Sequence, residues 1–78
     1  EKNMPIHKVI SPLTGSIWKI ELTVGQAVTA GQSAVILESM KAEFSIDAPV
    51  TGIVQEIVLS EGDEVYEDDV IFTIEADD

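Results

Sequence analysis

Lys41 is the residue of this sequence whose surroundings most clearly point to chemistry. It lies in the stretch Glu38-Ser-Met-Lys-Ala-Glu43 between two predicted strands, so Met40 and Lys41 are predicted to form the tip of a tight hairpin. Such tips normally use Asn-Gly or Asp-Gly, because both central residues need a positive φ. A non-glycine residue in that conformation costs about 1–2 kcal/mol, and such departures cluster at functional sites. The departure from ordinary turn chemistry at this one tip therefore predicts a functional site at Lys41.

Other kinds of active site find no support in the sequence. The chain has no cysteine for a nucleophile, a disulfide or a thiolate metal site, and His7 is its single histidine. The carboxylates of Asp63, Asp68 and Asp69 do not match the spacing of a calcium-binding loop. The serines that lack a suitable base nearby in the sequence are Ser11, Ser16, Ser33, Ser39, Ser45 and Ser60. We therefore predict no catalytic residue and no metal site.

The elements that position this tip come from an internal repeat. A shift of 37 residues aligns 11–38 with 48–75 without a gap, and eight of the 28 pairs are identical, against about two expected by chance. Each copy opens with Pro-x-Thr-Gly, a turn signal, and continues with a run rich in Ile, Val and Leu. Short strands separated by glycine and proline indicate an all-β fold, a flattened barrel or sandwich with quasi-twofold symmetry.

The repeat also predicts turns and the two ends of the molecule. Gly31 aligns with Asp68, and Asp tolerates the left-handed conformation that glycine adopts in turns. The join between the copies, Ser39 to Phe44, is expected to form a hairpin at one end. Under the 37-residue shift its counterpart is the place where the chain termini meet, so the termini are expected at the end opposite Lys41.

The aligned pairs separate the inner from the outer positions of the strands. Ile36 aligns with Thr73, so this position is not expected to require an apolar side chain. Trp18 aligns with Gln55, which predicts a tryptophan that partly covers a sheet edge and does not anchor the core. Positions that are apolar in both copies are predicted to face inward. They are Ile20 with Ile57, Leu22 with Leu59, Val35 with Phe72 and Leu37 with Ile74.

Size and charge narrow the class of protein. The 78 residues suffice for one domain, predicted over residues 6–76, which buries about 62% of its unfolded surface. Residues 1–5 are set aside as a scar or disordered N-terminus. The net charge of −11 predicts no nucleic-acid partner. The short apolar runs predict no membrane span, and with the absence of cysteine they favour a cytoplasmic protein. The high negative charge favours an isolated domain that is monomeric.

The acidic segment 61–69 has two readings that composition leaves open. It contains Glu61, Asp63, Glu64, Glu67, Asp68 and Asp69. One reading is a solvated face that keeps a small protein soluble. The other is a docking surface for a basic partner enzyme.

Several of these features together resemble the biotinyl/lipoyl attachment domain family. They are the 38–41 tip, the Pro-x-Thr-Gly turns and the segments 25–28 and 62–65, and the resemblance covers residues 6–74. It implies a barrel-sandwich hybrid of two four-stranded antiparallel sheets, with Lys41 as the lysine that a dedicated ligase modifies. The tip residues beside this acceptor are then Glu38, Ser39, Met40, Ala42 and Glu43.

The motif favours biotin as the cofactor. Biotin acceptors of the family resemble Ala/Ser-Met-Lys-Met, whereas lipoyl acceptors resemble Asp-Lys-Ala. Here the sequence is Ser39-Met-Lys-Ala42, without an acid directly before Lys41, and the following Glu43 looks more like the biotin group. We therefore expect biotin, with lipoate as the alternative.

The resemblance then implies a non-catalytic carrier of a biotin-dependent carboxylase, of the acyl-CoA carboxylase type. After modification by biotin protein ligase, Lys41 would carry carboxybiotin between biotin carboxylase and carboxyltransferase. Two alternatives stay open. The chain is a lipoyl carrier of a 2-oxoacid dehydrogenase complex, or it is an unmodified interaction module of the same fold.

Overall fold

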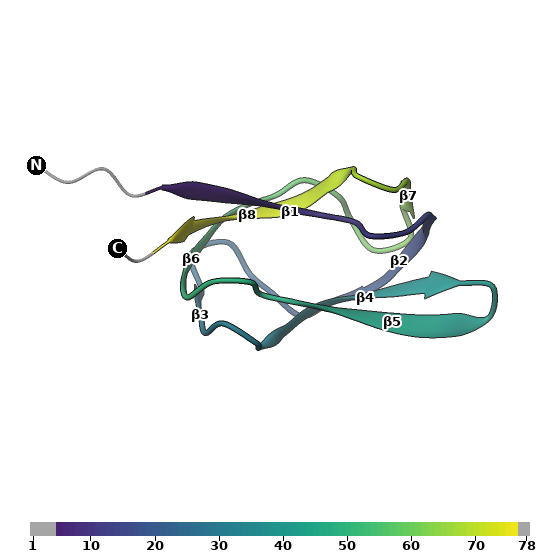
Figure 1. Ribbon diagram of the computed structural model, residues 1–78, viewed down its shortest axis with the longest axis horizontal. Helices are drawn as coiled ribbons and strands as arrows, with labels where there is room; N and C mark the ends of the chain where they lie inside the picture. The colour runs from purple at the N-terminus through teal and green to yellow at the C-terminus, as the bar shows by residue number, and fades with distance from the viewer. Residues whose placement is uncertain (1–4, 77–78) are drawn as a thin grey trace, which may run out of the picture.

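The computed structural model describes residues 5–76, and within them the chain forms eight strands in two sheets (Figure 1). Residues 1–4, part of the predicted N-terminal scar, lie outside the described residues. One sheet has the order β1-β8-β6-β3 and the other the order β5-β4-β2-β7, with antiparallel pairing throughout the described part. The strands are β1 (Ile6–Ile10), β2 (Gly15–Ile20), β3 (Ala27–Val28), β4 (Ser33–Ser39), β5 (Ala42–Asp47), β6 (Gly52–Ile57), β7 (Glu64–Val65) and β8 (Val70–Ala76).

The 37-residue repeat relates one sheet to the other. The same shift extends the two copies backwards to include β1 and β5. It thus takes β1, β2, β3 and β4 of the first copy onto β5, β6, β7 and β8 of the second. Applied to the sheet order β1-β8-β6-β3, the same exchange gives β5-β4-β2-β7, which is the order of the second sheet. Each sheet therefore takes two strands from each copy. The predicted quasi-twofold sandwich of two four-stranded sheets is confirmed.

Thr14 and Gly15 of the first copy make the same backbone contacts as their identical counterparts, Thr51 and Gly52, in the second. Thr14 Oγ1 accepts a hydrogen bond of 3.0 Å from the Glu67 amide, and Thr51 Oγ1 accepts one of the same length from the Ala30 amide. The glycine that follows each threonine allows a close approach of two strands. A Cβ on Gly15 would strike the backbone of β4, and a Cβ on the equivalent Gly52 that of β8.

The turns repeat as well, including the one whose residue type changes. Gly31 has a φ of 92° and the aligned Asp68 a φ of 74°, so the aspartate adopts the predicted left-handed conformation. Asp63 and Asp69 each accept a hydrogen bond from a backbone amide three residues earlier, through their carboxylates. Gln26 and Gln32 do the same at the aligned positions. Two of the carboxylates in segment 61–69 thus hold turns.

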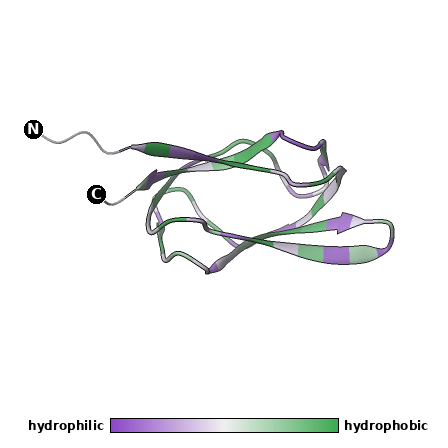
Figure 2. Ribbon diagram, viewed as in Figure 1, coloured by the Kyte–Doolittle hydropathy of each residue, from purple (hydrophilic) through white to green (hydrophobic). Residues whose placement is uncertain are grey.

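The core lies between the two sheets and agrees in large part with the predicted faces. Val35, Leu37, Phe72 and Ile74 are fully buried, and Leu22 is buried at the edge of the cluster. The remaining predicted inner residues pack against this core and are only partly buried: Ile20, Ile57 and Leu59. The alternation of hydrophobic and hydrophilic residues is visible along β5, an edge strand from which Ile46 packs against this core (Figure 2).

Two positions predicted to lie outside the core behave differently. Trp18 is 50% exposed and falls in a bulge of β2, beyond the end of the short β7, so it does not anchor the core, as predicted. Thr73 is 6% exposed, and its Oγ1 donates a hydrogen bond of 3.1 Å to Gln55 Oε1. This position does not require an apolar group, as expected. It is nevertheless buried, and the burial of the hydroxyl is tolerated because it has a hydrogen-bond partner.

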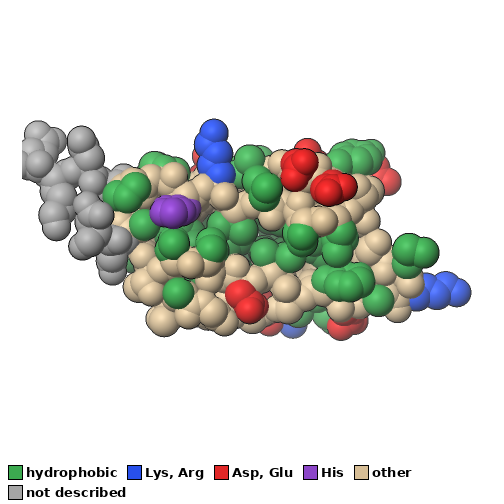
Figure 3. All heavy atoms as spheres, in the orientation of Figure 1, with side chains coloured by type: hydrophobic (Ala, Val, Ile, Leu, Met, Phe, Trp, Pro, Cys, Tyr) green, Lys and Arg blue, Asp and Glu red, His purple; other side chains and the backbone are tan. Residues whose placement is uncertain are grey.

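The β4–β5 hairpin lies at one end of the molecule, and the start of β1 and the end of β8 lie at the other, as predicted for the segments next to the termini (Figure 1). The termini themselves lie outside the described residues. At the far end from the hairpin, Ile6 of β1 pairs with Glu75 of β8. Acidic side chains on the visible face lie mostly in the half of the molecule away from the chain ends (Figure 3).

Candidate functional site

The hairpin tip consists of Met40 and Lys41. Ser39, the last residue of β4, pairs with Ala42, the first of β5, which leaves two residues in the turn. Met40 has a φ of 53° and Lys41 a φ of 66°. Both central residues thus meet the positive-φ requirement of a type I′ turn without the glycine or asparagine that usually satisfies it. Lys41 is exposed, and Met40 is 96% exposed.

The predicted flanking residues Glu38 and Glu43 form a pair behind the tip. They lie directly opposite one another on β4 and β5. Their neighbours Leu37 and Phe44 pair on the inner face, so the two carboxylates share the outer face of the sheet. Ser16 of β2 is paired with Glu38 in the same row.

This outer row continues to Glu64 of β7, which pairs with Ser16. Across the four strands the row is Glu64, Ser16, Glu38 and Glu43. The equivalent row of the other sheet is Ala27, Ile53, Glu75 and Ile6, with one carboxylate instead of three. Because the fold is built with either row, three carboxylates at the Lys41 end are not a requirement of the fold.

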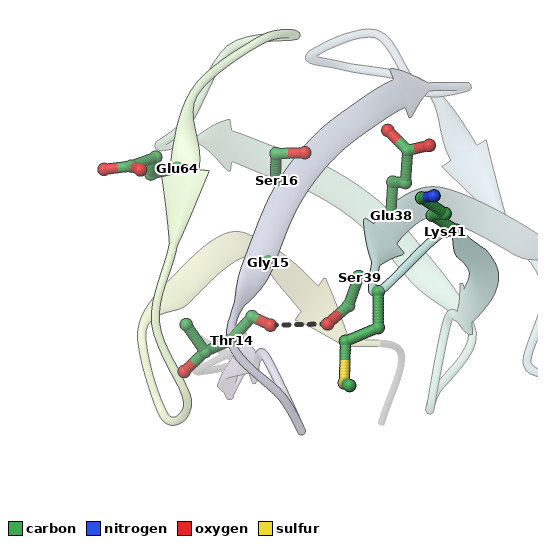
Figure 4. Close-up of a pocket in the computed structure, with 8 residues that line it drawn as sticks. Thr14, Gly15, Ser16, Glu38, Ser39, Lys41 and Glu64 are labelled. Atoms are coloured by element: carbon green, nitrogen blue, oxygen red, sulfur yellow. Dashed lines mark hydrogen bonds between the residues drawn. The ribbon is translucent and has the colours of Figure 1, made fainter.

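Ser39 connects the tip to the first copy's turn. Its Oγ donates a hydrogen bond of 2.9 Å to the carbonyl oxygen of Thr14, as the dashed line in Figure 4 shows. A shallow, open hollow lies beside the tip between these two segments (Figure 4). Its lining comes from the turn before β2, from β2, β4 and β7, and from the tip: Thr14, Gly15, Ser16, Glu38, Ser39, Met40, Lys41 and Glu64.

Comparison with known proteins shows the family to which the chain belongs. A family model described as "Biotin-requiring enzyme" matches residues 7–74. The chain is also 42% identical over 62 residues to the biotin/lipoyl attachment protein of Bacillus subtilis, a match that covers 80% of this chain and 85% of that protein. This chain belongs to the biotin/lipoyl attachment family.

Larger proteins contain regions similar to this attachment domain. Over 75 residues it is 32% identical to pyruvate carboxylase of Staphylococcus aureus, covering 96% of the domain and 6% of that enzyme. The structure of urea carboxylase from Kluyveromyces lactis superposes with a TM-score of 0.84 at 34% identity, over 95% of the domain and 6% of that chain. The attachment domain is thus akin to the biotin carrier domains of carboxylases, and it spans 6% of the length of each of these two relatives.

Four residues of the hollow were not predicted from the sequence: Thr14, Gly15, Ser16 and Glu64. They come from β2 and β7 and from the turn before β2, and reach the tip through pairing between distant segments. The signal available was the identity of Thr14 and Gly15 in both copies, which marks the turn as structurally required. It did not indicate that this turn lies against the acceptor hairpin.

Glu64, which lines the hollow beside the tip, contacts the side chain of Tyr66. Tyr66 donates a hydrogen bond of 3.2 Å from its hydroxyl to Glu64 Oε1. The negative charge of Glu64, followed by this hydrogen bond, raises the pKa of Tyr66 above its usual value.

Among the described residues no cluster of three potential metal ligands occurs, and they contain no helix long and apolar enough to span a membrane.

Proposed function

We propose that this domain carries biotin as an amide on Nζ of Lys41 and serves as the carrier of a biotin-dependent carboxylase. The observation that carries the proposal is the position of Lys41. Its amine is exposed at the two-residue tip of a hairpin, at the end of the molecule opposite the start of β1 and the end of β8 (Figure 1). Membership in the biotin/lipoyl attachment family supplies the chemical context.

The tip is suited to accept a cofactor that bears a carboxylate. Lys41 and Met40 are both exposed, so a ligase can reach the amine and its apolar neighbour together. In the modification, Lys41 Nζ forms a bond to the cofactor's carboxyl carbon and gives up a proton. One carboxyl oxygen departs with the activating group, which the ligase takes from ATP. Biotin on this arm would supply a ureido nitrogen that accepts and releases a carboxyl group.

The rest of the domain holds the tip in a defined place. β4 and β5 pair at six positions, from the pair Ser33–Asp47 to the pair Ser39–Ala42 beside the tip, and β4 pairs in turn with β2. A stiff hairpin of this kind presents the modified lysine predictably to two active sites. Tethering then replaces free diffusion by a high local concentration of the carried group at each site.

Two observations support biotin over lipoate. Met40 stands before Lys41, where an acid would be expected in a lipoyl acceptor. Relatives that cover nearly the whole domain are named as pyruvate and urea carboxylases. Ala42 is the departure from the biotin pattern. The relatives differ in the molecule that they carboxylate, so the carrier role is the part of the proposal that they share.

The proposal is tested by labelling the purified unmodified domain with a biotin ligase and with a lipoate ligase, each with its cofactor and ATP. We expect biotin to be attached and lipoate to be refused. Ala42→Met restores an apolar contact for the ligase and should raise the rate of biotinylation, by at most about tenfold. Met40→Asp creates the Asp-Lys-Ala triplet and should suppress biotinylation.

The alternatives give different results in the same assay. Ready attachment of lipoate with no biotin would make the domain a lipoyl carrier. Attachment of neither would favour an unmodified interaction module and overturn the carrier proposal.

A further inference from the structure

The internal repeat allows contacts that the fold requires to be distinguished from contacts that are particular to the Met40–Lys41 tip. Contacts found in both copies are required at both ends of the molecule, including the end without the acceptor hairpin. Thr14 and Thr51 accept equivalent backbone hydrogen bonds, and Gly15 and Gly52 allow equivalent close approaches. A contact made in one copy alone is not explained by the fold.

The hydrogen bond from Ser39 to Thr14 is of this second kind. The residue aligned with Ser39 is Ala76, which ends β8 and has no hydroxyl. Thr51, the residue aligned with Thr14, therefore has no equivalent bond to its carbonyl from that position. The difference falls at the hairpin that bears Lys41.

The geometry shows how this bond is made. Gly15 has no side chain, so the start of β2 lies against the backbone of Glu38 and close to Ser39. Ser39 is half-buried, and from this position its Oγ reaches the Thr14 carbonyl at 2.9 Å (Figure 4). The Thr14 side chain is itself held by the Glu67 amide, 3.0 Å from its Oγ1. Ser39, at the base of the tip, is thus hydrogen-bonded to Thr14, and the Thr14 side chain is in turn hydrogen-bonded to the backbone of Glu67.

We propose that Ser39 is a positioning residue, which orients the Met40–Lys41 turn for the enzymes that act on Lys41. The strained turn begins at the residue after Ser39. A tie at this point limits rocking of the hairpin tip relative to the two sheets. Loss of the tie leaves the fold intact, since the other end of the molecule does without it. This inference rests on the proposed modification of Lys41.

The test compares three variants of the whole domain. Ser39→Ala removes the hydroxyl and installs the residue type of the aligned position, and Ser39→Thr keeps the hydroxyl. Ser45→Ala is the matched control, because Ser45 lies on β5 of the same hairpin and its Oγ is 3.0 Å from that of Ser33, away from the tip. The measurements are biotinylation kinetics with a biotin ligase, thermal unfolding, and NMR backbone order parameters of Met40 and Lys41.

We expect Ser39→Ala to lower kcat/KM for biotinylation by about two- to threefold, chiefly through a higher KM, a small loss because the acceptor motif also admits alanine at this position. The order parameters of both turn residues should fall, while the unfolding temperature stays close to that of the parent domain. Ser39→Thr and Ser45→Ala should show neither effect.

Two results would overturn the proposal. One is a Ser39→Ala variant with parent-like order parameters at the tip, because any loss of rate would then reflect direct contact with the ligase. The other is a more mobile tip that is biotinylated at the parent rate. If the parent domain itself takes no biotin, the proposed function fails, and unchanged order parameters in Ser39→Ala would separately refute the tie.

Discussion

Glu38 and Glu43 lie directly opposite one another on β4 and β5, with both carboxylates on the outer face of the sheet. Like charges in this cross-strand arrangement are destabilising. The aligned pair of the other sheet, Glu75 and Ile6, avoids the conflict. The hairpin that bears Lys41 therefore carries a repulsion that the fold does not need.

Relief of this repulsion should stabilise the domain. We predict that Glu43→Gln raises the free energy of unfolding by about 0.2–1 kcal/mol at low ionic strength, with a smaller gain at high salt. Urea unfolding at the two salt concentrations measures the change. Glu56→Gln is the control, because it removes the same charge from an exposed strand position opposite Thr73. An equal gain in the control would mean that net charge, and not the pair, is responsible.

Gly15 and Gly52 should be equally intolerant of a side chain. A Cβ at either position would strike a backbone carbonyl, of Glu38 or Glu75, which cannot move without shifting a strand. We predict that Gly15→Ala and Gly52→Ala each destabilise the domain by about 1–3 kcal/mol or more, a large share of the stability of a domain this small.

The comparison variant for these glycines is Gly25→Ala. A Cβ there has open space around it, and the cost is limited to the strain of its φ of 91°, about 1–2 kcal/mol. Thermal unfolding of the three variants checks the order. Parent-like stability of Gly15→Ala would show that β2 and β4 do not approach as closely as described.

The titration of Tyr66 reports on the charge of Glu64 beside the tip. The negative carboxylate disfavours the phenolate, and so raises the pKa of the phenol. Glu64→Gln should therefore lower the pKa of Tyr66 toward its usual value. Tyr66 is the single tyrosine of the sequence, so its ionisation can be followed by ultraviolet absorbance. The pKa should not change in Glu56→Gln, and an unchanged pKa in Glu64→Gln would contradict the contact.

The sequence predicted the fold because the repeat encodes it twice. Aligned Gly31 and Asp68 indicated a shared turn, and both have the expected positive φ. The Met40–Lys41 tip stood out because its residue types conflict with the turn that its spacing requires. These are local signals, and they can be read before any strand is paired.

The missed features depend on contacts between distant segments. The position of Thr14 beside Ser39 follows from the pairing of β2 with β4, and the residue types do not indicate it. Leu59 aligns with the buried Leu22 but is only partly buried, since identity of residue type does not ensure equal burial. Thr73 is buried because Gln55 accepts its hydroxyl hydrogen, a partner that comes from another strand.

Lys41 is the proposed attachment site, and the intact mass of a Lys41 variant tests this assignment most directly. After incubation with biotin ligase, biotin and ATP, the parent domain and Lys19→Arg should each gain the mass of one biotinyl group. Lys41→Arg should gain none and keep the parent's thermal unfolding, because the position is exposed and a guanidinium does not form the amide. A folded Lys41→Arg variant that still gained a biotinyl group would contradict the assignment.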